Sequence, residues 1–178
     1  QQLQLGEGLY YLLDRIPTPV SSDDLILGRI NEEIPDEEGE ALLKLTAEKW
    51  GRGIPPWMPD GGHETFAWEL LVKLGLTGLE DFAKQELDRR IDAGDTGSHL
   101  DFLKGAILIY QALRNYARRY AVSAHEAGLH FQAENCSAIA ERPPETFTEA
   151  IQLLWIVGVV YCAMVSVNAT LTFGRMDE

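Results

Sequence analysis

The sequence predicts a mainly α-helical protein, and three observations carry that prediction. Between residues 98 and 135, apolar residues recur at intervals of three and four, the spacing of one face of a long helix. A second apolar run follows a Pro-Pro pair and a helix-start signal near residue 147. A third helix start is indicated by Pro35 and the acidic residues that follow it. We therefore expect long antiparallel helices and a strand content below about a quarter.

Length and composition indicate one globular unit that spans residues 1–178. The chain is long enough to bury a sizeable core, and its 46% hydrophobic and 24% charged residues are typical of a folded domain. The formal net charge of -13 repels phosphate backbones, so we expect no nucleic-acid partner. The same acidic balance favours solubility.

The first fifty residues alternate between apolar segments and breaks. Residues 2–13 form a short apolar-rich segment, and the prolines within 16–20 favour an extended backbone. Residues 24–29 fit either a short strand or an irregular buried piece. A helix is expected from about residue 36 to Trp50.

The middle of the chain predicts two helical segments and then one long helix. The segments cover 64–73 and 79–90, are separated by a break at two glycines, Gly75 and Gly78, and end in a polar turn at 92–97. The long helix near 98–135 would begin at a cap formed by residues 98–101. Its apolar face comprises Leu103, Ile107, Tyr110, Leu113, Ala117, Tyr120 and Ala124.

The last predicted helix spans residues 147–167. Thr146 and Glu149 fit a capping box, in which each residue satisfies a backbone N–H at the other end of the first turn. From Ala150 to Val167 the chain carries no charge, which is near the lower length limit of a membrane span. No Lys or Arg flanks this run closely, so we expect a helix buried in a protein core and no membrane partner.

His63 is a candidate site residue because of its position in the sequence. It ends a loop at 51–62 that is dense in glycine and proline, and it directly precedes a predicted helix. At a helix N-terminus the dipole disfavours the imidazolium form, which leaves a neutral donor and acceptor suited to a hydroxylated substrate. The alternative is a histidine that only caps or packs the loop.

The remaining reactive residue types form no catalytic constellation in the sequence. Cys136 and Cys162 lie among apolar neighbours without a metal-ligand spacing, which favours reduced core residues and a cytoplasmic protein. No secretory signal pattern precedes them. The other histidines lack the spacing of a metal site, and adjacent carboxylates are expected to be solvated. We therefore assign no catalytic, metal or cofactor-binding residue.

Several segments, in chain order, resemble the glycyl radical enzymes, the superfamily of pyruvate formate-lyase and the radical dehydratases. Residues 23–29, D-D-L-I-L-G-R, are similar to that family's D-E-L-I-V-G-N. Gly62-His63 followed by G-L-T-G at 75–78 resembles G-H-x-x-P-D-Y-x-x-x-L-x-x-G-L-x-G, with Phe66-Ala67 in place of Pro-Asp. Residues 142–155, R-P-P-E-T-F-T-E-A-I-Q-L-L-W, resemble R-P-P-x-T-F-x-E-A-L-Q-x-x-W, and residues 172–177 resemble S-L-G-R-x-D.

This resemblance implies a helical portion of the pyruvate formate-lyase-like α/β barrel fold, taken from the N-terminal half. The family's chemistry uses a protein glycyl radical, installed by a separate radical S-adenosylmethionine activase, and a cysteine thiyl radical. The G-C-x-E cysteine loop and the R-V-x-G-Y glycyl loop are not found in these residues. His63 matches a position that helps bind hydroxylated substrates in the dehydratases, and Thr172 matches a small hydroxyl residue near the pocket. The resemblance therefore implies that both are substrate-binding residues.

Two functions compete at this point. The chain is either an N-terminal fragment of an anaerobic lyase or dehydratase for a small hydroxylated or carboxylated metabolite, or a helical interaction protein without radical chemistry. The start at Gln1 and the end within the G-R-M-D segment favour the fragment, which would not be catalytic alone. Its expected partners are the remainder of the parent enzyme, the activase, a small-molecule substrate and a second copy in a homo-oligomer.

Overall fold

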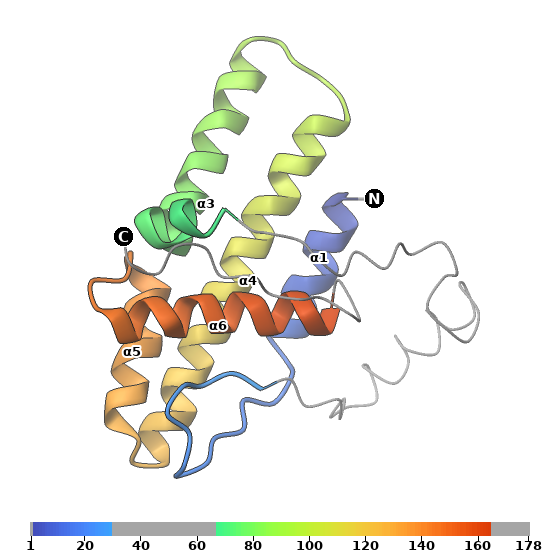
Figure 1. Cartoon of the computed structure of the whole chain (residues 1–178). Helices are drawn as coiled ribbons and strands as arrows, with labels where there is room; N and C mark the ends of the chain where they lie inside the picture. Colours follow the sequence, from blue (N-terminus) through green and yellow to red (C-terminus); the bar gives the residue numbers. More distant parts are fainter. Residues whose placement is uncertain (1, 30–66, 165–178) are drawn as a thin grey trace, which may run out of the picture.

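The computed structural model describes residues 2–29 and 67–164, which form the helical body in Figure 1. The helices of this part are α1 (Gln2–Leu13), α3 (Trp68–Asp92), α4 (Ser98–Glu126), α5 (His130–Glu141) and α6 (Phe147–Met164). No strand occurs among the described residues. The prediction of a mainly α protein is confirmed for them. The helix and the loop predicted at 36–50 and 51–62 lie outside the described residues.

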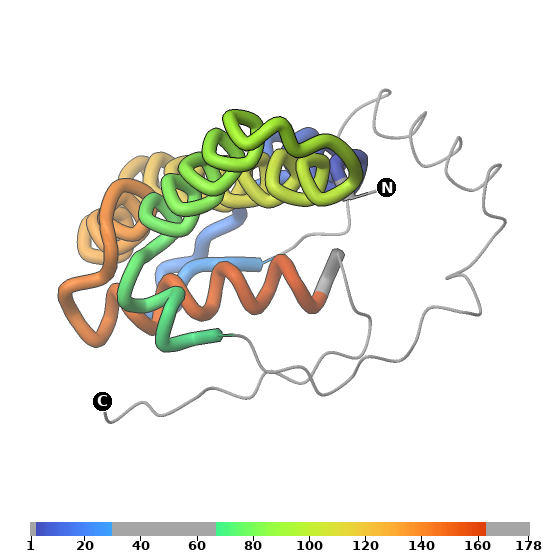
Figure 2. Tube along the Cα trace, turned by 90° about the horizontal axis from the view of Figure 1, so that it is seen from above, coloured from blue at the N-terminus to red at the C-terminus, as the bar shows by residue number. Residues whose placement is uncertain are grey.

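The helices form two layers, and α4 is the central helix of the first layer. Helices α1, α3 and α5 all pack directly on α4. Figure 2 shows α1, α4, α5 and most of α3 in one layer, whereas the start of α3 lies in the other layer. Helix α6 lies in a second layer, next to the segment that follows α1. The hydrophobic core lies between the layers and includes Leu13, Leu27, Tyr116, Ile139 and Leu153.

The long helix predicted at 98–135 is wrong in its extent, because two helices occupy that region. Helix α4 ends at Glu126, and α5 begins at His130. Between them, Gly128 adopts a φ of 78°, and the N–H of Leu129 donates to the carbonyl of Ala124 at 2.8 Å. A glycine in the left-handed region closes a helix because it has no Cβ to clash.

The predicted apolar face of α4 is buried only in its second half. The first half forms a hairpin with α3 that projects beyond the other helices in Figure 1, so it has fewer neighbours. The buried members of the predicted face are Leu113, Ala117, Tyr120 and Ala124, and the partly buried members are Leu103, Ile107 and Tyr110.

The break predicted near Gly75 and Gly78 is present at Gly75. Helix α3 runs through both positions, but Gly75 has a φ of 63° and kinks it, whereas Gly78 is helical. A Cβ on Gly75 would lie 2.8 Å from the Cα of Pro143, so a larger residue would both strain the backbone and clash. The polar turn predicted at 92–97 links α3 to α4.

The capping box predicted for the last helix is confirmed. The N–H of Glu149 donates to Oγ1 of Thr146 at 3.2 Å, and the N–H of Thr146 donates to Oε2 of Glu149 at 3.3 Å. Residues 165–167 of the predicted helix lie outside the described residues. Within the described ranges, no helix is long and apolar enough to cross a membrane.

Residues 24–29, predicted as a strand or an irregular buried piece, are irregular. Leu27 and Gly28 are buried beside α6, whereas the side chain of Leu25 points away from the core and is 81% exposed. The polar groups of this backbone pair with side chains of α4, α5 and α6, described below. The apolar-rich segment at 2–13 is helix α1.

Candidate functional site

Both predicted substrate-binding residues, His63 and Thr172, lie outside the described residues. The structure describes residues on both sides of His63 in the sequence, and residues before Thr172 only. The segment that carries His63 runs from Arg29 to the start of α3 at Trp68, and Thr172 follows α6. The scaffold combines residues of the family-like motifs with residues of α3, α4 and α5, and it joins positions far apart in the sequence.

Gln152 of α6 holds the backbone of Leu27 through both ends of its side-chain amide. The N–H of Leu27 donates to Oε1 of Gln152 at 2.9 Å, and Nε2 donates to the carbonyl of Leu27 at 2.6 Å. The Gln152 side chain is fully buried. The two residues are 125 positions apart in the sequence. The Gln152 side chain supplies Leu27 with the backbone hydrogen bonds that a neighbouring β-strand would otherwise supply.

Three aromatic side chains hold the next two residues. Trp155 donates from Nε1 to the carbonyl of Gly28 at 3.0 Å. The hydroxyls of Tyr116 and Tyr120 donate to the carbonyl of Arg29 at 2.9 and 2.6 Å, and the N–H of Arg29 donates to the Tyr120 hydroxyl at 2.7 Å. Burial raises the pKa of both tyrosines, so each remains a neutral hydroxyl. We call Tyr116, Tyr120, Gln152 and Trp155 the backbone cradle.

A second junction ties the R-P-P motif to the start of α6. Arg142 donates from Nη1 and Nη2 to the two carboxylate oxygens of Glu149 at 2.9 and 2.8 Å. The N–H of Glu145 adds a bond of 2.7 Å to Glu149. Hydrogen bonds from Arg142 hold the pKa of Glu149 below its ordinary value, so the carboxylate is ionised at the positive end of the helix dipole. Pro143 closes this junction against Gly75.

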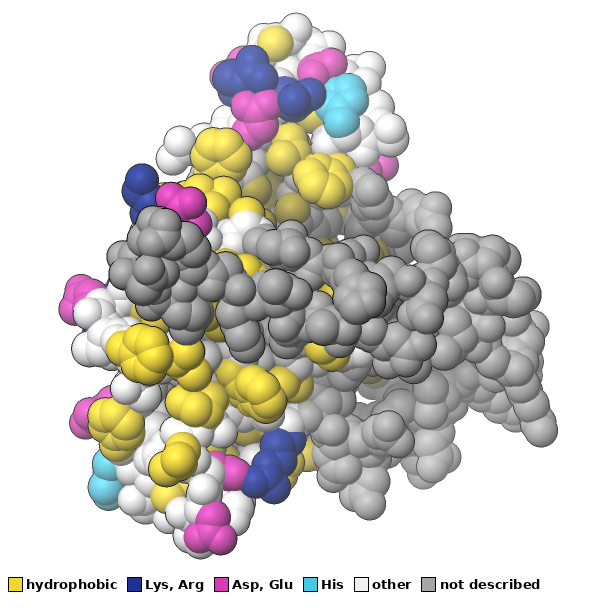
Figure 3. All heavy atoms as spheres, in the orientation of Figure 1, with side chains coloured by type: hydrophobic (Ala, Val, Ile, Leu, Met, Phe, Trp, Pro, Cys, Tyr) yellow, Lys and Arg dark blue, Asp and Glu magenta, His cyan; other side chains and the backbone are white. Residues whose placement is uncertain are grey.

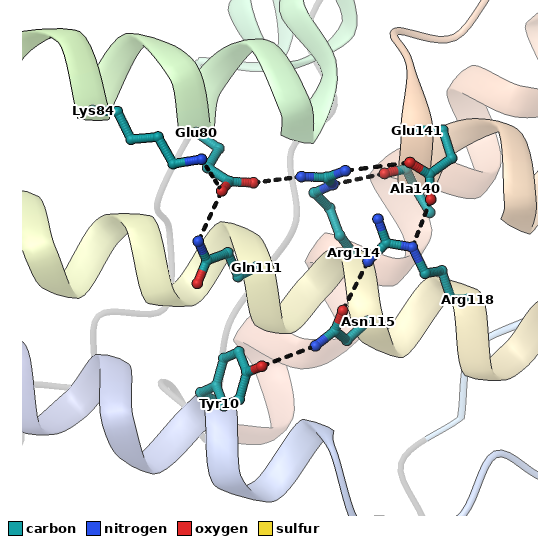
Figure 4. A network of polar contacts seen from close by, with 9 residues as sticks. All are labelled: Tyr10, Glu80, Lys84, Gln111, Arg114, Asn115, Arg118, Ala140 and Glu141. Carbon is teal, nitrogen blue, oxygen red and sulfur yellow. Dashed lines mark hydrogen bonds and ion pairs between the residues drawn. The ribbon is translucent and has the colours of Figure 1, made fainter.

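A buried ionic network, shown in Figure 4, joins α3, α4 and α5. The carboxylate of Glu80 accepts from Lys84 at 2.6 Å, from Gln111 at 2.8 Å and from Arg114 at 2.6 Å. Arg114 continues to the carbonyl of Ala140 at 2.7 Å. Burial alone would raise the pKa of Glu80, but these hydrogen bonds outweigh it and hold the pKa below the ordinary value.

The outer part of the same network lies at the end of α5. Glu141 accepts from Arg114 at 3.3 Å and from Arg118 at 2.5 Å. Arg118 also donates to Asn115, whose amide reaches the hydroxyl of Tyr10 in α1. Each Lys and Arg side chain in Figure 4 pairs with a carboxylate. We therefore interpret the network as a structural connection between α1, α3, α4 and α5.

Sequence reasoning missed this network because it treated carboxylates as solvated. The position of Glu80 relative to the apolar residues of α3 is the signal that could have revealed the network. Glu80 lies four residues after Leu76 and three before Ala83, so it shares the buried face of α3. A carboxylate on a buried face needs cationic partners, and Arg114 and Lys84 are within reach along two helices.

The reactive side chains of the described residues do not gather into a catalytic set. Burial raises the pKa of Cys136 to about 12, so its thiol stays protonated near neutral pH. Cys162 is partly buried on α6, and burial raises its pKa as well. His125 and His130 are exposed, and His99 pairs with Asp95 at 3.0 Å. In residues 2–29 and 67–164 we find no group of three side chains suited to a metal ion.

Comparison with known proteins agrees with this scaffold. The model of the pyruvate formate lyase-like family matches residues 28–178. The protein named "Probable dehydratase YbiW" of Escherichia coli K12 is 29% identical over 128 residues, which cover 65% of this chain and 16% of that protein. The (2S)-3-sulfopropanediol dehydratase of Klebsiella oxytoca is 27% identical over 170 residues, or 88% of this chain and 20% of that enzyme.

A solved structure gives the same result for the fold. A glycyl radical enzyme from Archaeoglobus fulgidus superposes with a TM-score of 0.69 at 19% identity, over 90% of this chain and 29% of that one. The chain therefore belongs to the pyruvate formate lyase-like family of glycyl radical enzymes. It spans one fifth or less of the length of the two curated relatives named above.

Proposed function

We propose that these residues are the N-terminal helical part of a glycyl radical dehydratase that acts on a small hydroxylated metabolite. One observation carries the proposal: the backbone cradle joins residues 23–29 to residues 142–155, and Pro143 lies against Gly75, so three of the family-like motifs meet in one scaffold. In the sequence, this scaffold lies on both sides of His63 and precedes Thr172, the two expected substrate-binding residues. The whole of residues 1–178 acts as a single structural unit.

The substrate class follows from relatives and from the two predicted residues together. One relative is named for the dehydration of a sulfonated diol, and another is named a dehydratase. His63 and Thr172 offer the neutral donors and acceptors that a hydroxylated or carboxylated compound requires. In this role His63 binds and orients a substrate hydroxyl, and Thr172 adds a second hydrogen bond.

The radical chemistry belongs to the rest of the parent enzyme. A protein glycyl radical, installed by a radical S-adenosylmethionine activase, supplies the hydrogen abstraction that dehydration needs. The 178 residues then contribute binding and shape, and they do not catalyse the reaction alone. We place the enzyme in the cytoplasm under anaerobic conditions and expect a homo-oligomer.

The experiment that tests this function uses the complete polypeptide that contains these residues. After anaerobic activation, it is offered small vicinal diols, and the aldehyde formed together with one water is measured. Pyruvate with coenzyme A serves as the alternative substrate. Aldehyde formation supports the proposal. Cleavage of pyruvate instead, or no turnover by a polypeptide that carries its radical, would contradict the dehydratase assignment.

A further inference from the structure

Most large apolar motif side chains of the described part are buried in the scaffold. Trp155 is 41% exposed but donates a hydrogen bond to Gly28, and two others are more exposed. Leu25, in the segment at 23–29, is 81% exposed, and Phe147, at the start of α6, is 70% exposed. Both line the same surface hollow of about 320 Å³, together with Ile26, Phe131, Gln132, Thr148 and Ile151. Figure 3 shows hydrophobic side chains gathered over α5 and the start of α6.

The lining does not suit a small hydroxylated substrate. Such a compound needs several convergent hydrogen-bonding groups, and the only polar side chains of the lining are Gln132 and Thr148. Nε2 of Gln132 is already committed to the carbonyl of Asp24 at 2.8 Å. What remains is an apolar surface, with Phe131 58% exposed. Exposed apolar surfaces of this kind mark contacts with other polypeptide segments.

The charges around the hollow disfavour a dimer in which the same surface of a second copy fills it. Three exposed carboxylates lie within three positions of lining residues: Asp23 near Leu25, Glu134 near Phe131, and Glu145 near Phe147. Two such faces brought together would place like charges against each other.

We propose that this hollow is an intramolecular docking site, filled by an aliphatic or aromatic side chain from the part of the parent enzyme outside residues 1–178. The proposal rests on the proposed function. The chain covers only 16% and 20% of the two relatives, so about four fifths of a comparable polypeptide lies outside these residues and can supply the side chain that covers the hollow. The two most exposed of the large apolar motif side chains, Leu25 and Phe147, both line this hollow.

The test places a photoreactive side chain in the hollow of the complete polypeptide. The amino acid p-benzoylphenylalanine replaces Phe147, which is exposed, so the larger ring requires no repacking. A matched variant carries it in place of Phe82, another exposed phenylalanine, which lies on α3 and does not line the hollow. After irradiation, the crosslinked peptides are identified by mass spectrometry in a mixture of light and heavy isotope-labelled protein.

We expect a crosslink from position 147 to a peptide outside residues 1–178 of the same molecule, with a yield at least about fivefold above that from position 82. A crosslink to residues 30–66 or 165–178, to a second copy or to a separate protein would overturn the proposal. Equal yields from both positions, or no crosslink, would also overturn it. Failure of the proposed function is recognised separately, because it appears as missing aldehyde formation whatever the crosslink shows.

Discussion

At the scale of single residues, the scaffold depends on side chains that bond to backbone. The Gln152 amide satisfies both polar groups of Leu27, and the two tyrosines of α4 satisfy Arg29. An irregular buried segment would otherwise leave its N–H and C=O groups without partners, which is costly in a core. The motif residues of α6 are therefore explained by structure, without any contact with substrate.

Gln152→Leu should lower the free energy of unfolding by about 2–4 kcal/mol, because it leaves the buried N–H and C=O of Leu27 unpaired. Urea titration followed by circular dichroism measures the change. Gln85→Leu, at an exposed position on α3, is the matched control and should change stability by less than about 0.5 kcal/mol. Equal effects of the two substitutions would show that the amide bonds contribute nothing specific.

His63→Ala, in the complete and activated enzyme, should reduce turnover by about 10- to 100-fold, since one lost hydrogen bond to substrate is worth about 1–3 kcal/mol. The glycyl radical signal in electron paramagnetic resonance should keep its intensity, because the radical is installed elsewhere. His125→Ala, at an exposed position on α4, should leave turnover unchanged. Unaltered turnover in His63→Ala would return that residue to a role in loop packing.

At the scale of elements, the helices are held by close approach and by buried charge. Helix α1 crosses α4 at Gly6, where an added Cβ would lie 2.6 Å from the carbonyl oxygen of Gly105. The Glu80 network ties α3 to α4 and α5. The close approach at Gly6 sets the distance between α1 and α4. The Glu80 network determines which faces of α3, α4 and α5 are in contact.

Two alanine substitutions in α1 should have opposite effects. Gly6→Ala forces α1 away from α4 and should destabilise the fold by about 1–3 kcal/mol. Gly8→Ala adds a Cβ that meets nothing within 4 Å and should stabilise by about 0.5–1 kcal/mol, because alanine loses less entropy in a helix. Thermal unfolding of both variants measures the pair. The same sign for both would contradict the packing of α1 on α4.

Glu80→Gln should cost about 2–4 kcal/mol at pH 7, because it leaves Arg114 and Lys84 without their buried carboxylate. The pKa of Glu80 is lowered in the fold, so its contribution is present above the ordinary pKa of 4.5 and is lost as pH falls through the folded value. The difference from wild type should therefore shrink below about pH 4.5.

Denaturant titrations between pH 3 and pH 7 measure this dependence. Glu134→Gln, an exposed carboxylate on α5, should have little effect throughout the range. A deficit of Glu80→Gln that grows as the pH falls would contradict the lowered pKa.

The extent to which the sequence predicted these elements depends on how local each signal is. The capping box of Thr146 and Glu149 and the break at Gly75 were predicted correctly because each is set by neighbouring residues. The division of residues 98–135 into two helices was missed, because a single turn at Gly128 does not interrupt a long apolar pattern. The bonds from Gln152 to Leu27 connect residues 125 positions apart, which no local pattern encodes.

Position in the sequence indicated His63 as a candidate site residue, whereas only the family resemblance indicated Thr172. Periodicity identified helices, but it gave no reason to connect residues 23–29 with residues 142–155. The resemblance did connect them in one family, and the structure brings both segments into one scaffold. The roles of His63 and Thr172 stay predictions, since both residues lie outside the described part.

At the scale of the whole molecule, the chain is a scaffold whose reacting groups are expected elsewhere. The backbone cradle holds Arg29, where the described part ends before His63, and the Arg142–Glu149 junction holds the start of α6, the helix that precedes Thr172. Radical chemistry requires the cysteine and glycine loops to be held in contact with a bound substrate, and effective molarity is lost when either is missing. The central claim is that these residues support catalysis in a larger enzyme and do not catalyse alone.

Electron paramagnetic resonance combined with a turnover assay tests that claim most directly. The complete polypeptide and the 178-residue chain are incubated anaerobically with the activase and a small diol. We expect a glycyl radical signal and aldehyde formation for the complete polypeptide, and neither for the 178 residues. A radical signal with turnover from the 178-residue chain, or a complete polypeptide that accepts no radical, would contradict the account.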